Sequence, residues 1–162
     1  MARKSKTEVE ADSEAGDYDN ILNRQWGDIP EVVLIPSGSW VLKGKNAAYK
    51  APSGESNGRV LFFLVPKEPM DDVPQSALDA LGDDYDYSSN QIVKTVWIES
   101  NRDWKTVEKI LTAMNVDMSG TIQQTLKRVK GAEVVAFVDQ REFVSRGETK
   151  QENTAENFTA LS

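Results

Sequence analysis

The stretch "SWVLKGKNAAYKAPSGESNGRVLFFLVP", residues 39–66, decides most of the fold. Residues 39–50 have the composition of a strand, and residues 51–58 form a turn cluster of Pro, Ser, Gly and Asn. The run that follows is rich in β-branched and aromatic residues, is apolar on both faces and ends at Pro66. We therefore predict a hairpin whose second strand is a central, buried strand of a sheet.

The rest of the chain adds further strands and two or three short helices to this hairpin. Alternating or continuous apolar runs predict strands over residues 90–100, 132–146 and 152–161. Apolar residues spaced by three and four predict helices over residues 74–81, 101–116 and 119–131. Glycines 82 and 131 are expected to end the first and the last of these helices. This order predicts a mainly β fold with inserted helices (α+β), built as a small antiparallel barrel.

The composition restricts the chemistry. The chain has 162 residues, which suits one domain, and it contains neither histidine nor cysteine. Disulfides, thiolate catalysis, imidazole-based triads and the usual zinc sites are therefore excluded. We expect a protein that is not an enzyme and needs no cofactor. No apolar run reaches about 18 residues and no signal peptide is visible, so we expect no membrane span and a cytoplasmic location.

Acidic residues are concentrated in two segments of the chain. Residues 1–20 carry a net charge of −3 and are read as a mobile acidic arm that precedes a single domain over residues 21–162. Residues 67–87, an acidic insertion between two strands, carry −6, whereas the helical insertion over residues 101–130 is not acidic in this way. Since the whole chain carries −7, the remaining residues carry +2. A basic binding face is therefore compatible with the acidic composition.

Several short motifs resemble those of a known family. The chain has a "P-x-G-x-[WY]" pattern before the first hairpin, the segment "LKRVKGAEVVAFVDQREF" at residues 126–143, and an "N-x-x-x-N-F" pattern in the last strand. The residues of the two patterns are Pro36, Gly38 and Trp40, then Asn153, Asn157 and Phe158. Together they resemble the small phage-encoded single-stranded-DNA-binding proteins. The resemblance implies an OB-like β-barrel that coats single-stranded DNA in replication and recombination, in the cytoplasm of the host cell.

Candidate DNA-binding residues combine rings for base stacking with cations for phosphates, as binding without sequence preference requires. Lys43, Lys45 and Tyr49 are expected to share one face of the first strand, as Arg141 and Phe143 do on the fourth. Lys94 and Trp97 have opposite parity, so one of them is expected to face inward. The predicted contact residues are Lys43, Lys45, Tyr49, Lys50, Arg59, Lys94, Trp97, Arg141, Phe143 and Arg146.

Other interpretations remain open at this stage. The alternation of Asp83, Asp84 and Asp86 resembles the start of a calcium loop, but Ser89 and Thr95 stand where glycine and glutamate are needed, so no metal is expected. The chain ends without an acidic tail, so recruitment of phage or host replication proteins would fall to the two acidic segments. Self-association is left open. A phage virion or assembly protein, and an acidic inhibitor that mimics DNA, are the alternative functions.

Overall fold

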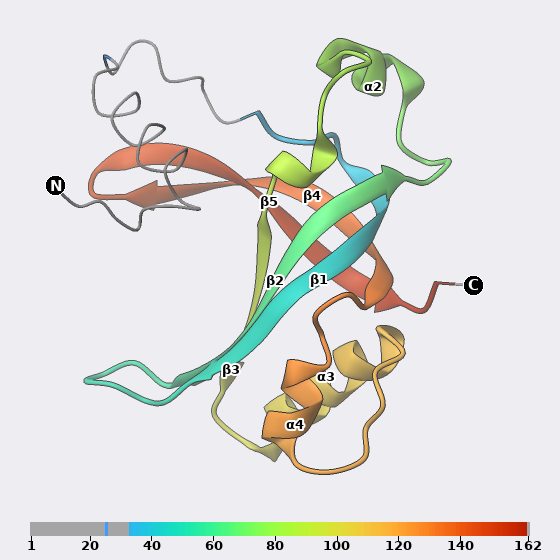
Figure 1. Ribbon diagram of the computed structural model, residues 1–162. Coiled ribbons are helices and arrows are strands. Elements are labelled where there is room, and N and C mark those ends of the chain that lie inside the picture. The colour runs from blue at the N-terminus through green and yellow to red at the C-terminus, as the bar shows by residue number, and fades with distance from the viewer. Residues whose placement is uncertain (1–24, 26–32, 162) are drawn as a thin grey trace, which may run out of the picture. The chain divides into compact units, whose positions relative to one another are not determined.

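The computed structural model describes residue 25 and residues 33–161, so the predicted acidic arm over residues 1–20 lies outside the described residues (Figure 1). The strands are β1 (Gly38–Lys50), β2 (Gly58–Pro69), β3 (Ile92–Ile98), β4 (Glu133–Ser145) and β5 (Glu148–Thr159). The helices are α2 (Gln75–Leu81), the 3-10 turn η2 (Tyr87–Ser89), α3 (Asn101–Ala113) and α4 (Ile122–Lys127). The predicted order of strands and helices is confirmed, and the fold is mainly β with a few short helices.

The five strands form one antiparallel sheet in the order β3-β2-β1-β4-β5. The sheet curls until its two edge strands, β3 and β5, contact each other. It is nevertheless not closed into a barrel, so the predicted closure is wrong. The properties of the two edges account for this. β3 has only seven residues, a bulge at Asn157 (φ 55°) bends β5, and a side-chain ion pair, Lys94–Glu156, bridges the edges where a backbone ladder would lie.

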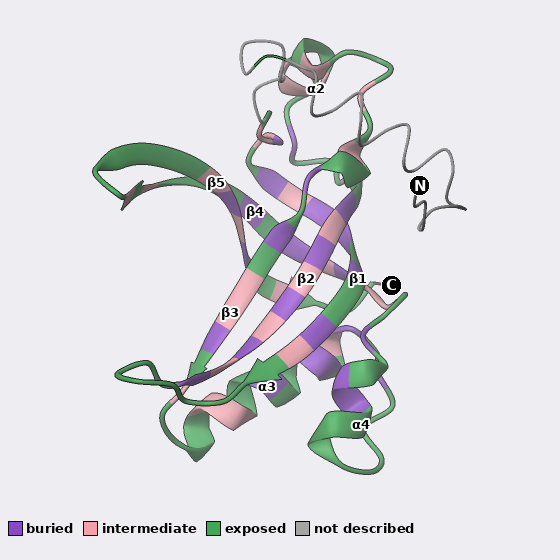
Figure 2. Cartoon of the chain, turned by 60° about the vertical axis from the view of Figure 1, so that its left-hand side comes forward, coloured by how far each residue is buried: buried purple, intermediate pink, exposed green. Residues whose placement is uncertain are grey.

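The inner face of the curled sheet is the hydrophobic core. On β2, Val60, Phe62 and Leu64 are fully buried, while the alternate residues Leu61 and Phe63 are only half-buried (Figure 2). The prediction of a strand covered on both faces is therefore only half right, because the side chains on its outer face stay partly exposed. Since successive side chains point to opposite faces, this alternation defines an outer surface that can meet a ligand.

A bulge in β1 changes which of its residues face outward. The pairing with β2 is irregular between Gly44 and Asn46, so Lys45 is an extra residue opposite β2. Gly44 is also where the segment before β4 crosses β1: its N–H donates to the Ala132 carbonyl at 2.7 Å, and its carbonyl accepts from the Gly131 N–H at 2.8 Å. A Cβ on Gly44 would lie 2.3 Å from the Val129 carbonyl oxygen, so only glycine allows this approach.

The helices begin and end for identifiable reasons. α3 starts with a capping box between Ser100 and Asp103, and it buries Val107, Ile110 and Leu111 against the core. α2 ends at Gly82 as predicted. α4 ends earlier than predicted, at Lys127, and the Arg128 side chain that follows donates to the carbonyls of Asp117 and Ser119 at 2.7 and 2.6 Å. None of the described helices is long and apolar enough to cross a membrane.

The motif residues behind the family resemblance have structural roles. The Trp40 indole N–H donates to the Pro36 carbonyl at 3.0 Å, and the ring is fully buried. Gly38 (φ 143°) lies against Val73, where a Cβ would clash. The buried Asn153 both accepts from the Ile35 N–H and donates to the Ile35 carbonyl, each at 3.0 Å. These motifs are therefore explained by the fold and do not by themselves indicate DNA contacts.

Candidate nucleic-acid interface

The outer face of β1, β2 and β3 carries a continuous row of basic, aromatic and aliphatic side chains. Residues opposite each other in an antiparallel ladder share a face, as do alternate residues of one strand. By this register Arg59 lies between Lys50 and Trp97, Leu61 opposite Thr95, and Phe63 opposite Val93. Val65 lies opposite Lys43 further along. We call this set the outer strip: Lys43, Lys50, Arg59, Leu61, Phe63, Val65, Val93, Thr95 and Trp97.

The row formed by Lys50, Arg59 and Trp97 has the chemistry that single-stranded nucleic acid requires. The Arg59 guanidinium lies over the Trp97 ring, 5.2 Å from its centroid, and 48% of the Trp97 surface remains exposed. A cation on one part of an exposed indole leaves the rest of the ring free to stack on a base, while the guanidinium stays close to the phosphates.

The cations of the outer strip have no ion-pair partner among the residues that the structure describes. Within residues 33–161 no ion pair forms with Lys43, Lys50 or Arg59, and the strip itself contains no acidic residue. Glu133 stands opposite Lys43 in the β1–β4 ladder, but its carboxylate pairs with Lys67 at 2.7 Å. This pairing raises the pKa of Lys67 through the hydrogen bond and the charge of Glu133. The positive charge of the strip is therefore available to an anionic ligand.

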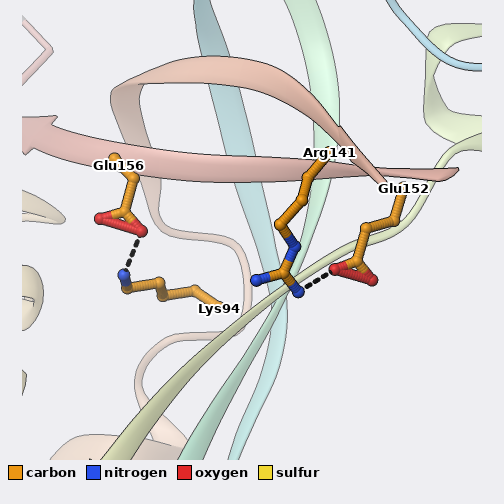
Figure 3. Close-up of polar contacts among 4 residues, drawn as sticks. All are labelled: Lys94, Arg141, Glu152 and Glu156. Carbon is orange, nitrogen blue, oxygen red and sulfur yellow. Dashed lines mark hydrogen bonds and ion pairs between the residues drawn. The ribbon is translucent and has the colours of Figure 1, made fainter. Parts of the chain in front are cut away.

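Two of the predicted contact cations are already paired with acidic residues. Lys94 has the parity of the buried Ile92 and Val96, and its ammonium donates to Glu156 at 2.5 Å across the two edge strands (Figure 3). Arg141 donates to Glu152 of the neighbouring strand (Figure 3). The expectation that either Lys94 or Trp97 faces inward is confirmed, with Lys94 as the inward residue. Lys94 therefore lies where β3 meets β5, and Arg141 lies on the β4–β5 hairpin. Neither residue belongs to the outer strip.

Tyr49 does not share a face with Lys43, so that prediction is wrong. The β1 bulge lies between them and shifts the alternation by one residue, which puts Tyr49 on the side of the helices. Its ring packs against Trp104 of α3 with 5.7 Å between the ring centroids. Tyr49 and Trp104 line a hollow together with Ile122 and Leu126, away from Arg59 and Trp97.

Phe143 and Arg146 lie at the far end of the β4–β5 hairpin, which extends beyond the rest of the sheet (Figure 1). Phe143 is half-buried opposite Lys150, and Arg146 (φ 54°) is exposed in the turn. Residues 139–152 contain four acidic and three basic side chains, so this hairpin is not a basic surface. The structure does not join these two predicted contacts to the outer strip.

The sequence did not single out Phe63 or Val93 of this region. Phe63 and Val93 complete the apolar part of the outer strip. A signal for Phe63 existed, because it follows Phe62 directly and adjacent residues of a strand face opposite sides. Lys130 belongs to a basic cluster in the sequence, with Lys127 and Arg128, that suggests an extension of the phosphate track formed by the strand lysines, and it lines a hollow with Lys43 and Lys45.

The acidic insertion borders one end of the outer strip, and part of it is structural. Tyr87 packs edge-on against Trp40 with 5.0 Å between the ring centroids. Asp86 accepts from the Ser88 N–H and lines a hollow with Lys43. Asp72 accepts from the backbone N–H and the hydroxyl of Ser39, and these bonds hold its pKa below the usual value. Asp83 and Asp84, which are exposed, are better placed for an electrostatic role.

No protein-family model matches this sequence, and no curated protein matches it significantly. The likeness to phage single-stranded-DNA-binding proteins therefore rests on the short motifs described above. Within residues 33–161 no group of three or more acidic side chains is placed to hold a metal ion.

Proposed function

We propose that this protein binds single-stranded DNA through the outer strip and coats it, without catalysis, in phage DNA replication or recombination. The observation that carries the proposal is the row of Lys50, Arg59 and Trp97, with its half-exposed ring and with cations that form no ion pair within residues 33–161. Phe63, opposite Val93 on the same face, adds a second ring on which a base can stack. The motif resemblance supplies the biological setting, in the cytoplasm of a host cell.

We further propose that the fold is OB-like, a curled five-stranded antiparallel sheet whose edge strands β3 and β5 contact each other without pairing. The sheet order, read around the curl, brings β3 next to β5, and a helical insertion lies between β3 and β4. OB-folds bind oligonucleotides on the outer surface of their second and third strands. The outer strip lies on the corresponding strands of this chain, which supports the proposal.

A second candidate is a role in assembly through protein contacts. The hollow between β1, α3 and α4 is lined mostly by apolar side chains, and Ile122 on its rim is 51% exposed. Such a surface suits a protein partner better than a polyanion. This observation favours the alternative of a virion or assembly protein, and the mapping experiment in the Discussion separates the two.

Binding to labelled oligothymidylate is expected to weaken steeply as salt rises, because phosphate contacts release counterions. A logarithmic plot of affinity against salt should have a slope of about −0.7 for each phosphate contact. Duplex DNA of matched length should bind more weakly, since Trp97 cannot stack on paired bases. Fluorescence anisotropy titrations at several salt concentrations measure both. A flat salt response, or equal affinity for duplex, would contradict the proposal.

Neutralising Asp83 and Asp84 with asparagine is expected to tighten DNA binding, because they belong to the acidic insertion, whose Asp86 lines a hollow with Lys43, and their negative charges repel phosphates. The gain should be roughly twofold to fivefold at low salt and should disappear when salt screens the charges. A matched control replaces Glu142 and Glu148 on the hairpin with glutamine, which changes the net charge equally. An equal effect in both variants would mean that only net charge matters and that the insertion does not shield the strip.

A further inference from the structure

Three lysines converge beside the Lys43 end of the outer strip. Lys43 and Lys45 come from β1 and Lys130 from the segment before β4, and together they line one hollow with Val65 and Ser88. We call Lys43, Lys45 and Lys130 the lysine pocket. All three side chains are exposed, so their ammonium groups can reach a ligand from solvent.

The backbone holds this convergence in place. Gly44, between the two β1 lysines, exchanges hydrogen bonds with Gly131 and Ala132 at 2.8 and 2.7 Å. The absence of a side chain on Gly44 lets the segment of Lys130 approach β1 this closely. The bulge at the same place adds Lys45 to the strand. The pocket is therefore a product of the fold, made from residues far apart in the sequence.

Carboxylates of the described residues form no direct ion pair with the lysine pocket. Within residues 33–161 none of its three lysines forms an ion pair. Glu133, opposite Lys43, pairs with Lys67, and Asp86 accepts two hydrogen bonds from Ser88. Three like charges that have no direct ion pair repel one another, and a bound anion relieves this repulsion.

We propose that the lysine pocket is a phosphate-binding site that holds a phosphate of the DNA backbone next to the outer strip. Lysine binds phosphate as a point charge and needs no fixed geometry, which suits flexible exposed side chains. Lys43 belongs both to the pocket and to the outer strip, and Val65 of the strip lines the same hollow. A DNA strand whose bases stack along Phe63 and Trp97 would therefore continue into the pocket. The DNA part of this inference rests on the proposed function, whereas the binding of a phosphoryl group does not.

The test uses the full chain with Lys130→Gln and a control, Lys109→Gln, which removes the same charge from an exposed position on α3. In the first arm, without DNA, inorganic tripolyphosphate is added and the melting temperature is recorded. A ligand that binds only the folded state raises this temperature. We expect a rise for the wild type and for Lys109→Gln, and a much smaller one for Lys130→Gln. An equal rise in melting temperature in all three proteins, or no rise in the wild type, would contradict the proposal that the lysine pocket binds phosphate.

In the second arm, oligothymidylates with and without a 5′-phosphate are titrated at several salt concentrations. If the pocket holds a backbone phosphate, Lys130→Gln should make the slope of log affinity against log salt shallower by about 0.7 for both oligonucleotides. Lys109→Gln should leave this slope unchanged. A loss confined to the phosphorylated oligonucleotide would overturn the backbone assignment in favour of a terminal phosphate. Tripolyphosphate binding without any DNA binding would leave the pocket standing and contradict the proposed function.

Discussion

Replacing Trp97 with alanine is expected to lower the affinity for oligothymidylate by about fivefold to 150-fold. This is the loss expected when one base, stacked at about 1–3 kcal/mol, loses its ring. Trp97 is suited to this role because it is half-exposed, lies beside Arg59 and has Lys50 in the same row. Anisotropy titrations of the variant and the wild type at one fixed low salt concentration measure the difference.

The melting temperature separates loss of stacking from loss of folding. Trp97→Ala removes an exposed ring and one cation–π contact of about 0.5–1 kcal/mol, so the melting temperature should fall by no more than about 4 °C. Tyr49→Ala is the matched control, because this ring is similarly exposed but packs on Trp104. It should lower stability and leave DNA affinity nearly unchanged. Equal affinity losses in the two variants would mean that the outer strip has no special role.

Replacing Gly44 with alanine is expected to destabilise the fold by about 1–3 kcal/mol, which corresponds to a fall of roughly 2–12 °C in the melting temperature. The new Cβ would meet the Val129 carbonyl oxygen at 2.3 Å, and this neighbour is backbone, which cannot move aside as a flexible side chain can. Relief of the clash would stretch the two hydrogen bonds to Gly131 and Ala132. Thermal unfolding followed by circular dichroism measures the change.

Gly54→Asn is the control for this substitution. Gly54 lies in the turn between β1 and β2, has φ 58°, and nothing lies within 4 Å of the position of its missing Cβ. Asparagine tolerates this left-handed conformation, so stability should change little. If Gly44→Ala were as mild as Gly54→Asn, the close crossing of the two segments at Gly44 would be refuted.

Local patterns predicted the fold where local interactions decide it. The turn residues at 51–58 separate β1 from β2, and the 3-and-4 spacing from Trp104 to Met114 indicates α3. Contacts between distant segments could not be predicted in this way. The register irregularity at Gly44 depends on pairing with β2 and on the segment before β4, and it reversed the expected face of Tyr49. Lys94 and Arg141 looked available for phosphates because their partners, Glu156 and Glu152, lie on β5.

The residue types of the candidate site could be predicted from the sequence, but their positions on the sheet could not. Basic and aromatic residues were predicted as contacts, although the sequence could not show that they share one face, and the structure places Lys43, Lys50, Arg59 and Trp97 on one face. A closed barrel, with β3 paired to β5, was expected and is not found. The sequence pattern of a strand does not show where an edge strand is bent or where an ion pair such as Lys94–Glu156 joins two edges.

The most direct test of the central claim is amide chemical-shift mapping of the isotope-labelled protein during titration with oligothymidylate. The account predicts shifts along the outer strip, centred on Arg59, Phe63 and Trp97, with weaker shifts near Lys130. The hollow lined by Tyr49, Trp104 and Ile122 should remain unperturbed. Shifts confined to that hollow or to the β4–β5 hairpin, or no shifts with excess oligonucleotide, would contradict the claim that the outer strip binds single-stranded DNA.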